Sequence, residues 1–476
     1  MPSRLPHVHT NWPATARILG YALVCGLALS SSTGLGAQQP TAPAAAPAAA
    51  ARLQVPYEMF TLPNGLTVIL HQDRSVPKLE VNVWYHVGSA NEKPGRTGFA
   101  HLFEHLMFEG SGHVKEGLFD TLLESAGGNN NGSTNSDRTN YYETVPSNAL
   151  DLALFLESDR MGYLLDVVTP QMVDAQRDVV KNERRQRYEN APYGQAFLRI
   201  TELLYPKDHP YHWPPIGYME DLSAATHEDV IEFFKTYYAP GNASLVVAGD
   251  IDLAHARARV EHWFSDVKPG PSVPPLKVPV AELTGVVKET LTDRVQLPRL
   301  YLAWHSPGLY KPGDAELDVL SGLLTDGKNS RLYNRLVYDM QLAQDVSAFQ
   351  ASSKEGSIYI IIATARPSQD PHDQVLARLT TVIDEEIEKL KSAPPADREL
   401  TRVKSGIEAS FFSGMETVTD KAEQMNAYFT ATGNPDYFAE DLGRYQALSP
   451  SDIQAAVRRW LPKDRRLELA VVPAAK

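Results

Sequence analysis

The sequence predicts an α+β fold made of two homologous domains, because one half of the chain repeats the other. Residues 293–300 repeat the pattern of residues 73–79 at an offset of 220 to 221 positions. Nearer the C-terminus, residues 452–472 repeat residues 229–248 at an offset of 223 positions. Within each copy, strand-like alternation gives way to helical periodicity. We therefore expect two α/β-sandwich domains of the same fold.

Composition places the domain boundaries. Two arginines ahead of an apolar core of about twelve residues predict a signal peptide over residues 1–37, too short to span a membrane. A retained membrane anchor is the alternative interpretation. The Ala/Pro-rich residues 38–52 predict a disordered tether. A Pro-rich linker, residues 267–279, separates the first domain, 53–266, from the second domain, 280–476.

The predicted export and the net charge limit the location, the metal ligands and the partners that we expect. The signal peptide predicts a periplasmic protein rather than a secreted or membrane-associated one, with no stable membrane insertion. The single cysteine, Cys25, lies in the apolar core of that signal peptide. The exported chain would then contain no thiol, so a bound metal would need His and carboxylate ligands. The net charge of −13 argues against a nucleic-acid partner, which requires a basic surface.

A His-x-x-Glu-His motif stands in an otherwise apolar segment, residues 98–110. On a helix, His101 and His105 lie one turn apart on the same face and can bind one metal ion. Glu104 lies at the edge of that face, where its carboxylate can accept a proton from water. Hydrogen-bonded core histidines are the alternative interpretation. Two histidines and a glutamate are nevertheless costly to bury without a partner, and the motif therefore predicts a metal centre.

The other elements of the first domain follow from periodicity and turn residues. Residues 57–62 and 66–71 flank Pro63-Asn64-Gly65 and predict a β-hairpin. Residues 79–86 alternate apolar and polar side chains and predict a half-buried strand. Thr169-Pro170 predicts the start of a helix, with Thr169 as the N-cap. Helical patterns also mark residues 115–126, 148–164, 226–238 and 253–264, and an apolar strand pattern marks residues 243–249.

The second copy keeps the fold pattern without the motif. Its segment 315–324 stands where the first copy has the His-x-x-Glu-His helix, and it contains no metal ligands. A strand is predicted at residues 467–472, in the position of residues 245–248 of the first copy. We therefore expect only the first domain to bind a metal ion.

Several segments around the motif carry a family resemblance. They are residues 62–68, 87–89, 98–110, 127–128 and 131–134, with Asp137, Thr139 and Tyr141. Together with the inverted zincin spacing of the motif, they resemble the pitrilysin/insulinase family of zinc metallopeptidases. The chain looks similar to the beta-type subunit of mitochondrial processing peptidase and to bacterial two-chain members, over nearly all residues from about 53 onward. The resemblance implies that the two domains form half of a clam-like shell.

The resemblance implies one Zn²⁺ ion per chain, held by His101, His105 and Glu183, with Glu104 as the catalytic base. Glu183 follows His105 by 78 residues in a Val-x-x-Glu context similar to that of the family. Seven positions before this ligand the family commonly carries an acidic residue, and Gln176 stands there instead. An amide there can still hydrogen-bond near the ligands but lacks the charge that raises ligand basicity. On composition alone, the alternatives for the third ligand are Glu124, Glu143 and Glu189.

A polar run ahead of residues 139–145 contains Asn131, Gly132, Ser133 and Thr134. A hairpin loop is one interpretation of this run. The resemblance implies instead an exposed edge strand beside the metal, to which a peptide substrate adds through main-chain hydrogen bonds. Such binding tolerates varied sequences, because backbone hydrogen bonds do not distinguish side chains.

The resemblance also implies that a second domain supplies an Arg and a Tyr, seven residues apart, which hold the substrate. In this chain the corresponding positions are Val337 and Gln344. We therefore expect a homologous, zinc-less partner subunit to supply the Arg/Tyr pair. The sequence as a whole predicts a zinc metalloendopeptidase that cleaves peptides or unfolded segments, as the catalytic subunit of a heterodimer. The alternatives are a metal-binding but inactive structural subunit, and a periplasmic peptide-binding or chaperone-like protein.

Overall fold

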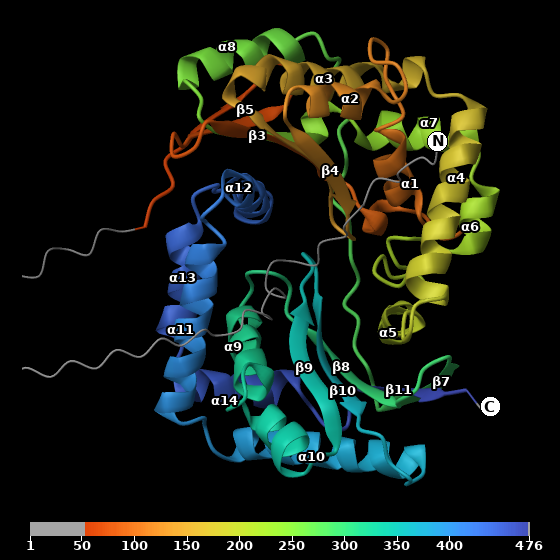
Figure 1. The fold of residues 1–476 in the computed structure, drawn as a ribbon, viewed down its shortest axis with the longest axis vertical. Helices are drawn as coiled ribbons and strands as arrows, with labels where there is room; N and C mark the ends of the chain where they lie inside the picture. Colours follow the sequence, from red (N-terminus) through yellow and green to blue (C-terminus); the bar gives the residue numbers. More distant parts are fainter. Residues whose placement is uncertain (1–52, 475–476) are drawn as a thin grey trace, which may run out of the picture.

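The computed structural model describes residues 53–474. The predicted signal peptide, residues 1–37, and the predicted tether, residues 38–52, lie outside the described part. Within it the predicted fold class is confirmed, because two domains of mixed helices and strands stand one above the other in Figure 1. No helix between residues 53 and 474 is both long enough and apolar enough to cross a membrane.

The first domain contains a six-stranded mixed sheet. Its first two strands form the hairpin predicted around Pro63-Asn64-Gly65, with Met59 opposite Ile69 in antiparallel register. The following strands do not pair in chain order, since the last strand inserts between the second and the third. Across the sheet the order is β1 (Glu58–Thr61), β2 (Thr67–Gln72), β6 (Ala243–Gly249), β3 (Lys78–Tyr85), β5 (Thr139–Pro146) and β4 (Asn129–Thr134).

The second domain repeats this sheet without an equivalent of β1. Its order is β7 (Val287–Asp293), β11 (Leu467–Pro473), β8 (Arg299–Ser306), β10 (Ser357–Ala365) and β9 (Ala343–Ala351). The last strand of the second sheet, β11, pairs in parallel with β7, as β6 pairs in parallel with β2 in the first sheet. β4 and β9 therefore occupy equivalent edges of the two sheets.

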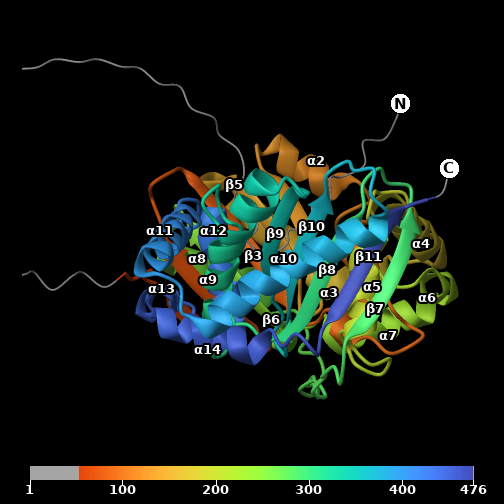
Figure 2. The same ribbon diagram turned by 90° about the horizontal axis from the view of Figure 1, so that it is seen from below.

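Each domain covers one face of its sheet with its own helices. In the first domain these are α1 (Phe99–Leu106), α2 (Leu118–Ser125), α3 (Leu150–Tyr163), α4 (Pro170–Arg184), α6 (Met219–Ala224), α7 (His227–Tyr237) and α8 (Leu253–Phe264). The Thr169 hydroxyl accepts the Met172 N–H at the start of α4, which confirms the predicted N-cap. In the second domain the helices are α9 (Asp314–Thr325), α10 (His372–Ser392), α11 (Asp397–Ser413), α13 (Phe438–Ala447) and α14 (Pro450–Trp460). Figure 2 shows α10 crossing β8 and β11.

The remaining face of each sheet is covered by a helix from the other domain. α5 (Gln195–Leu204) of the first domain packs its apolar side chains against β8 and β11 of the second sheet. α12 (Val418–Thr432) of the second domain packs against β3 and β6 of the first sheet. α12 begins 223 residues after α5, so the two helices are equivalent copies exchanged between the domains. Figure 1 shows both helices between the two sheets.

This exchange corrects the prediction of a half-buried strand at residues 79–86. β3 forms there, but both of its faces are buried: Glu80 and Asn82 are each 0% exposed and Trp84 is 7% exposed. The polar residues alternate with apolar ones because they face α12 rather than water. Asn82 and Trp84 donate hydrogen bonds to the carboxylate of Glu423 on α12. Alternating polar and apolar residues can therefore indicate a polar neighbouring helix as well as solvent.

Glu80 makes this interface pH-dependent. Its Oε2 accepts the hydroxyls of Thr144 at 2.6 Å and Thr419 at 3.0 Å. Burial raises the pKa of Glu80 to about 7, and the nearby carboxylates of Glu423 and Asp420 on α12 add to the rise. The carboxyl group is therefore largely neutral in the folded protein under mildly acidic conditions.

We expect Glu80→Gln to stabilise the protein mainly at neutral to alkaline pH. Because the folded pKa exceeds the unfolded value of 4.5, the contribution of Glu80 to the free energy of unfolding is fully present below pH 4.5 and is lost as the pH rises through about 7. A glutamine stays neutral, so the variant should exceed the wild type by less than about 1 kcal/mol near pH 5 and by about 3 kcal/mol near pH 8. Urea unfolding at the two pH values measures this. An equal difference at both would contradict the assignment.

Candidate metal centre

Helix α1 carries the His-x-x-Glu-His motif and begins after a glycine. Gly98 has a φ of 87°, in the left-handed region, and no side chain with which to cap the helix. The carboxylate of Glu92 takes this role by accepting the N–H groups of Gly98 and Ala100 at 3.0 and 2.8 Å. The first N–H groups of a helix otherwise lack partners, so Glu92 fixes the position at which α1 starts.

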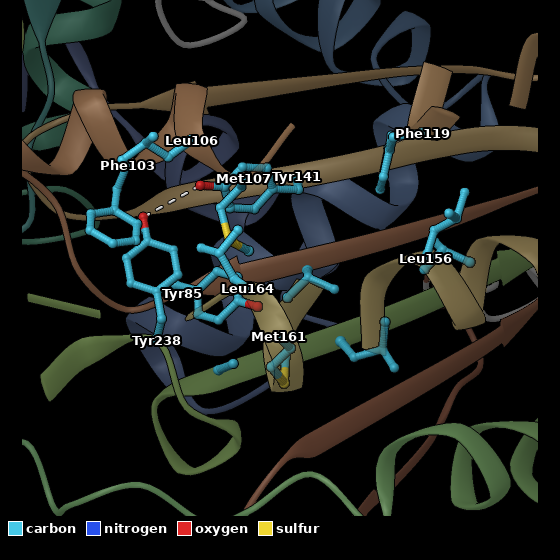
Figure 3. Close-up of a cluster of buried hydrophobic side chains, with 14 of the residues drawn as sticks. Tyr85, Phe103, Leu106, Met107, Phe119, Tyr141, Leu156, Met161, Leu164 and Tyr238 are labelled. Carbon is cyan, nitrogen blue, oxygen red and sulfur yellow. Dashed lines mark hydrogen bonds between the residues drawn. The ribbon is translucent and has the colours of Figure 1, made fainter. Parts of the chain in front are cut away.

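Aromatic packing holds α1 against the sheet. Phe103 of α1 lies against Phe233 and Tyr238, with ring centroids 5.5 and 4.9 Å apart. Tyr85 and Tyr141 extend this cluster from the sheet, as Figure 3 shows, and the hydroxyls of Tyr141 and Tyr238 lie 3.4 Å apart. Such close packing leaves little room for movement, so α1 holds its polar face in a defined position.

The end of α4 brings a third polar side chain to this face. Glu183 Oε2 lies 3.7 Å from His101 Nε2 and 3.3 Å from His105 Nε2. One possible ligand atom from each of the three residues lies within 4.8 Å of the others. A tetrahedral zinc ion with bonds of about 2.0 Å separates its ligand atoms by about 3.3 Å. The three side chains therefore fit an ion of this kind after small adjustments.

The protonation states of these groups also suit a cation. Burial lowers the pKa of His101 to about 3, and neither of its buried ring nitrogens makes a hydrogen bond. Burial opposes ionisation of Glu183, but His105, His101 and Arg187 together lower its pKa to about 2. A neutral imidazole and an ionised carboxylate are the forms that bind metals. Buried nitrogens without a partner are rare in proteins, and a metal ion would satisfy them.

The structure places the three alternative ligands elsewhere. Glu143 is fully buried in the core, where the Arg160 guanidinium lies 2.9 Å from its carboxylate. Glu189 pairs with Arg184 at 3.4 Å, and Glu124 lies on the exposed side of α2. Among the glutamates weighed for this position, Glu183 is the one that meets the two histidines.

Glu104 lies beside the candidate ligands without belonging to them. Its Oε2 accepts the hydroxyl of Thr134 at 2.6 Å, whereas its Oε1 is buried and has no hydrogen-bond partner in the described part of the chain. Burial raises the pKa of Glu104, although His105 and Thr134 partly offset this effect. A carboxylate with one fixed oxygen and one free oxygen is arranged to exchange a proton at the free one.

The run expected to bind substrate forms β4, the edge strand of the first sheet. Its side chains do not all face outward, because Ser133 and Thr134 are each 6% exposed. Thr134 contacts Glu104, and the Ser133 hydroxyl donates to Asn140 at 2.6 Å. The Gly132 N–H donates to the Asn131 side chain at 2.8 Å. The more exposed half of β4 is therefore residues 129–131, whereas residues 132–134 are buried. Sequence reasoning missed the contact between Thr134 and Glu104.

The side chain of Gln176 has a hydrogen-bond partner outside the candidate ligand set. Its amide donates a hydrogen bond to Glu109 Oε1 at 2.5 Å rather than to one of the three candidate ligands. Glu109 follows His105 by four residues, just beyond the end of α1. The amide therefore joins α4 to the segment after α1.

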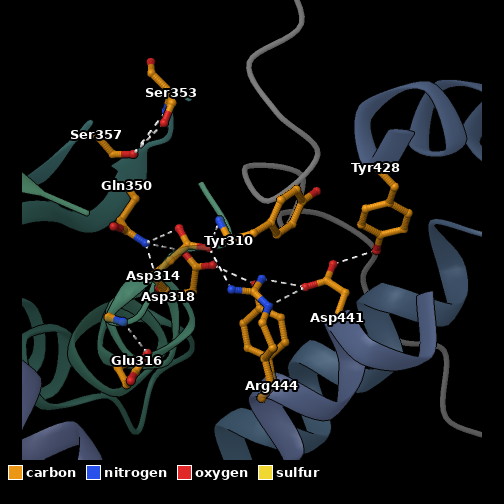
Figure 4. A network of polar contacts seen from close by, with 12 residues as sticks. Tyr310, Asp314, Glu316, Asp318, Gln350, Ser353, Ser357, Tyr428, Asp441 and Arg444 are labelled. Carbon is orange, nitrogen blue, oxygen red and sulfur yellow. Dashed lines mark hydrogen bonds and ion pairs between the residues drawn. The ribbon is translucent and has the colours of Figure 1, made fainter. Parts of the chain in front are cut away.

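The equivalent helix of the second domain carries a different set of polar groups. Asp314 on α9 lies 3.0 Å from Arg444, which also contacts Asp441. Asp318, one turn further along α9, accepts hydrogen bonds from Gln350 and from a tyrosine of α13. Figure 4 shows this network, in which each carboxylate faces a donor. Among residues 53–474, His101, His105 and Glu183 are the one cluster of side chains suited to hold a metal.

Two family models match the chain. One, described as insulinase (peptidase family M16), matches residues 67–205, and another, described as the peptidase M16 inactive domain, matches residues 224–407. The chain belongs to the insulinase (M16) family. All the candidate ligands of this M16 chain lie within the first match. The second match begins at the end of the first domain and includes α9, at which the structure shows no metal-ligand cluster among residues 53–474.

Similar proteins include named proteases of this family. The chain is 33% identical to the zinc protease PqqE of Helicobacter pylori over 77% of this chain and 82% of that protein. It is 23% identical to a probable mitochondrial-processing peptidase subunit beta of Arabidopsis thaliana, over 84% of this chain and 75% of that protein. A crystal structure of a protease from Helicobacter pylori matches with a TM-score of 0.81 and 28% identity, over 88% of this chain and all of that chain. The periplasmic protease PqqL of Escherichia coli shares the fold at 18% identity and a TM-score of 0.72, over 89% of this chain and 48% of that chain.

We expect Glu183→Gln to weaken zinc binding without unfolding the protein. The change removes the single negative charge among the three candidate ligands, so zinc affinity should fall by more than about 100-fold, the upper range for residues that only support a ligand. Competition with a chromogenic chelator measures the affinity. Glu189→Gln makes the same charge change six residues further along, at a residue that pairs with Arg184 instead. This matched control should bind zinc as the wild type does. Equal zinc affinity in both variants would contradict the proposed ligand set.

Proposed function

We propose that this chain is a zinc-dependent metalloendopeptidase that cleaves peptides or unfolded polypeptide segments. One observation carries the proposal: three potential ligands converge beside a fourth group, Glu104, which has one oxygen bound to Thr134 and the other without a partner. The names of relatives such as the zinc protease PqqE support the same reaction class.

The residues of the site divide the reaction between them. His101, His105 and Glu183 would hold the zinc ion, which when bound supplies Lewis-acid activation of a water molecule and of the scissile carbonyl. Glu104 would accept the proton of the attacking water at Oε1, because Oε2 is held by Thr134. The carboxyl group would then donate this proton to the leaving amine nitrogen. Thr134 would keep Glu104 in one orientation during both transfers.

The substrate would bind along the backbone edge of β4. This strand pairs with β5 on one side, and no strand among the described residues pairs with its other side. Its residue Gly132 lies next to Glu104, since a Cβ atom built there would come within 3.2 Å of Glu104 Cγ. A peptide added to this edge would therefore pass beside the catalytic carboxylate. Extended binding of this kind requires a peptide or an unfolded segment.

We further propose that the chain acts with a homologous zinc-less subunit. Val337 is 8% exposed within the apolar core of the second domain, and Gln344 lies near the start of β9, so neither position offers an Arg or a Tyr to a substrate. The chain matches about half of the PqqL chain, 48%, which is consistent with a fold that works in pairs. Residues 1–37 support a periplasmic location for such a complex.

Cleavage of an unstructured fluorogenic peptide tests the proposal. Residues 38–476 should cleave it weakly alone and faster with the zinc-less partner, and a chelator should abolish cleavage. Glu104→Gln should lower kcat by about 1,000-fold or more while leaving zinc content unchanged, because the proton acceptor is lost.

Three other outcomes are informative. Equal activity with and without the partner would contradict the heterodimer and leave the peptidase in place. Zinc binding without turnover in any combination would favour the inactive structural subunit. Peptide binding without turnover, unaffected by a chelator, would favour the peptide-binding or chaperone-like alternative.

We expect Thr134→Val to lower kcat by about 10- to 100-fold. The substitution keeps the shape of the side chain but removes a hydrogen bond to a charged group, which contributes about 1.5–3 kcal/mol. Thr134→Ser keeps the hydroxyl and is the matched control. Both variants should bind zinc normally and have KM values close to that of the wild type. Loss of zinc or equal kcat in the two variants would contradict the role of Thr134.

A further inference from the structure

The substrate strand β4 has little intrinsic preference for its conformation. Its sequence is Asn-Asn-Asn-Gly-Ser-Thr, and asparagine and glycine are among the residues depleted in strands. Within residues 53–474 it pairs with β5 alone, so its other edge makes no sheet hydrogen bonds in this part of the chain. Contacts from its two faces must therefore hold it in place. One face contributes Thr134, which contacts Glu104.

The opposite face of β4 is held by Arg138, from the turn that follows the strand. Arg138 Nη1 donates to the backbone oxygen of Ser133 at 2.8 Å and to its hydroxyl at 2.6 Å. The Ser133 hydroxyl in turn donates to Asn140 Oδ1 on β5. Arg138 is 8% exposed, and its guanidinium lies 5.0 Å from the ring centre of Trp84. A buried guanidinium of this kind needs a negative partner.

That partner comes from the second domain. Glu423 on α12 places Oε1 3.5 Å from Arg138 Nη2, the single ion pair of Arg138 within residues 53–474. Its Oε2 accepts N–H groups from Asn140 at 2.8 Å and from Asn82 and Trp84 at 3.0 Å each. One carboxylate thus binds two neighbouring strands, β3 and β5, and the arginine that holds β4.

We propose that Glu423 is a positioning residue through which the metal-free second domain holds the substrate strand of the first. The inference rests on the proposed function and goes beyond it, because it assigns the second domain a role in substrate binding within this chain. Glu423 acts through Arg138 and Asn140 on Ser133, and it touches neither the candidate ligands nor Glu104. Its loss should therefore loosen β4 and weaken substrate binding while the metal centre stays intact.

Kinetics of three variants test this inference. Glu423→Gln should raise KM roughly tenfold, keep kcat within about threefold of the wild type, and leave zinc content unchanged. Arg138→Gln should have the same effect, and the double variant should be no worse than either single one, because both act along one path. Glu416→Gln makes the same charge change at an exposed position just before α12 and should match the wild type. Unchanged KM in Glu423→Gln, or additive effects in the double variant, would overturn the inference.

A second readout separates this inference from the proposed peptidase activity. Backbone amide hydrogen exchange of residues 129–134 should be faster in Glu423→Gln than in the wild type and in Glu416→Gln, with zinc bound and no substrate present. Faster exchange in a protein that cleaves no peptide would support the anchoring role and contradict the proposed function. If the wild type cleaves peptides but Glu423→Gln exchanges no faster than the wild type, the anchoring role is overturned and the proposed function stays intact.

Discussion

The exchange of α5 and α12 between the domains is the constraint on which the rest of the structure depends. Each sheet buries one face under its own helices and the other under a helix that belongs, in the chain, to the other repeat. Neither domain can bury both faces of its sheet alone, since apolar residues such as Ile69 and Val246 are covered only when α12 is present. The second domain therefore completes the core of the first, even though its described residues bring no metal ligands.

Helices α5 and α12 cover the sheets of the opposite domains with different kinds of contact. The contact of α5 with the second sheet is largely apolar, with residues such as Ile200 against Ile360 in one buried cluster. The contact of α12 with β3 is half polar, because Glu423, Asn426 and Thr419 bind the polar side chains of that strand. Hydrogen bonds fix direction and register more strictly than apolar packing does. The first sheet carries the candidate site, and its contact with α12 therefore fixes the positions of its strands more strictly than the α5 contact fixes those of the second sheet.

Local sequence patterns predicted the helix that carries the candidate site but not the distant residues that contact this helix and its sheet. The His-x-x-Glu-His spacing and the Thr169 N-cap depend on residues a few positions apart, and the structure shows the helices where these signals place them. The convergence of Glu183 on the histidines was inferred from family resemblance, because no local pattern reports a contact across 78 residues. The polar face of β3 was misjudged for a related reason: its partner, Glu423, lies 341 residues beyond Asn82.

The asparagine-rich composition of β4 suits the peptide binding that we propose for this strand. A strand that must bind peptides needs an open edge, and an open edge of strongly strand-forming, apolar residues also pairs with other copies of the chain. A polar strand rich in asparagine avoids this hazard but cannot hold its own shape. Contacts with the second domain hold the strand in its conformation instead. Glu423 acts on one face of β4 through Arg138. At the tip of the β4–β5 hairpin, Asp137 accepts the N–H of Lys354, from the equivalent hairpin of the second domain, at 2.8 Å. The open edge can therefore stay both soluble and ordered because the second domain holds it.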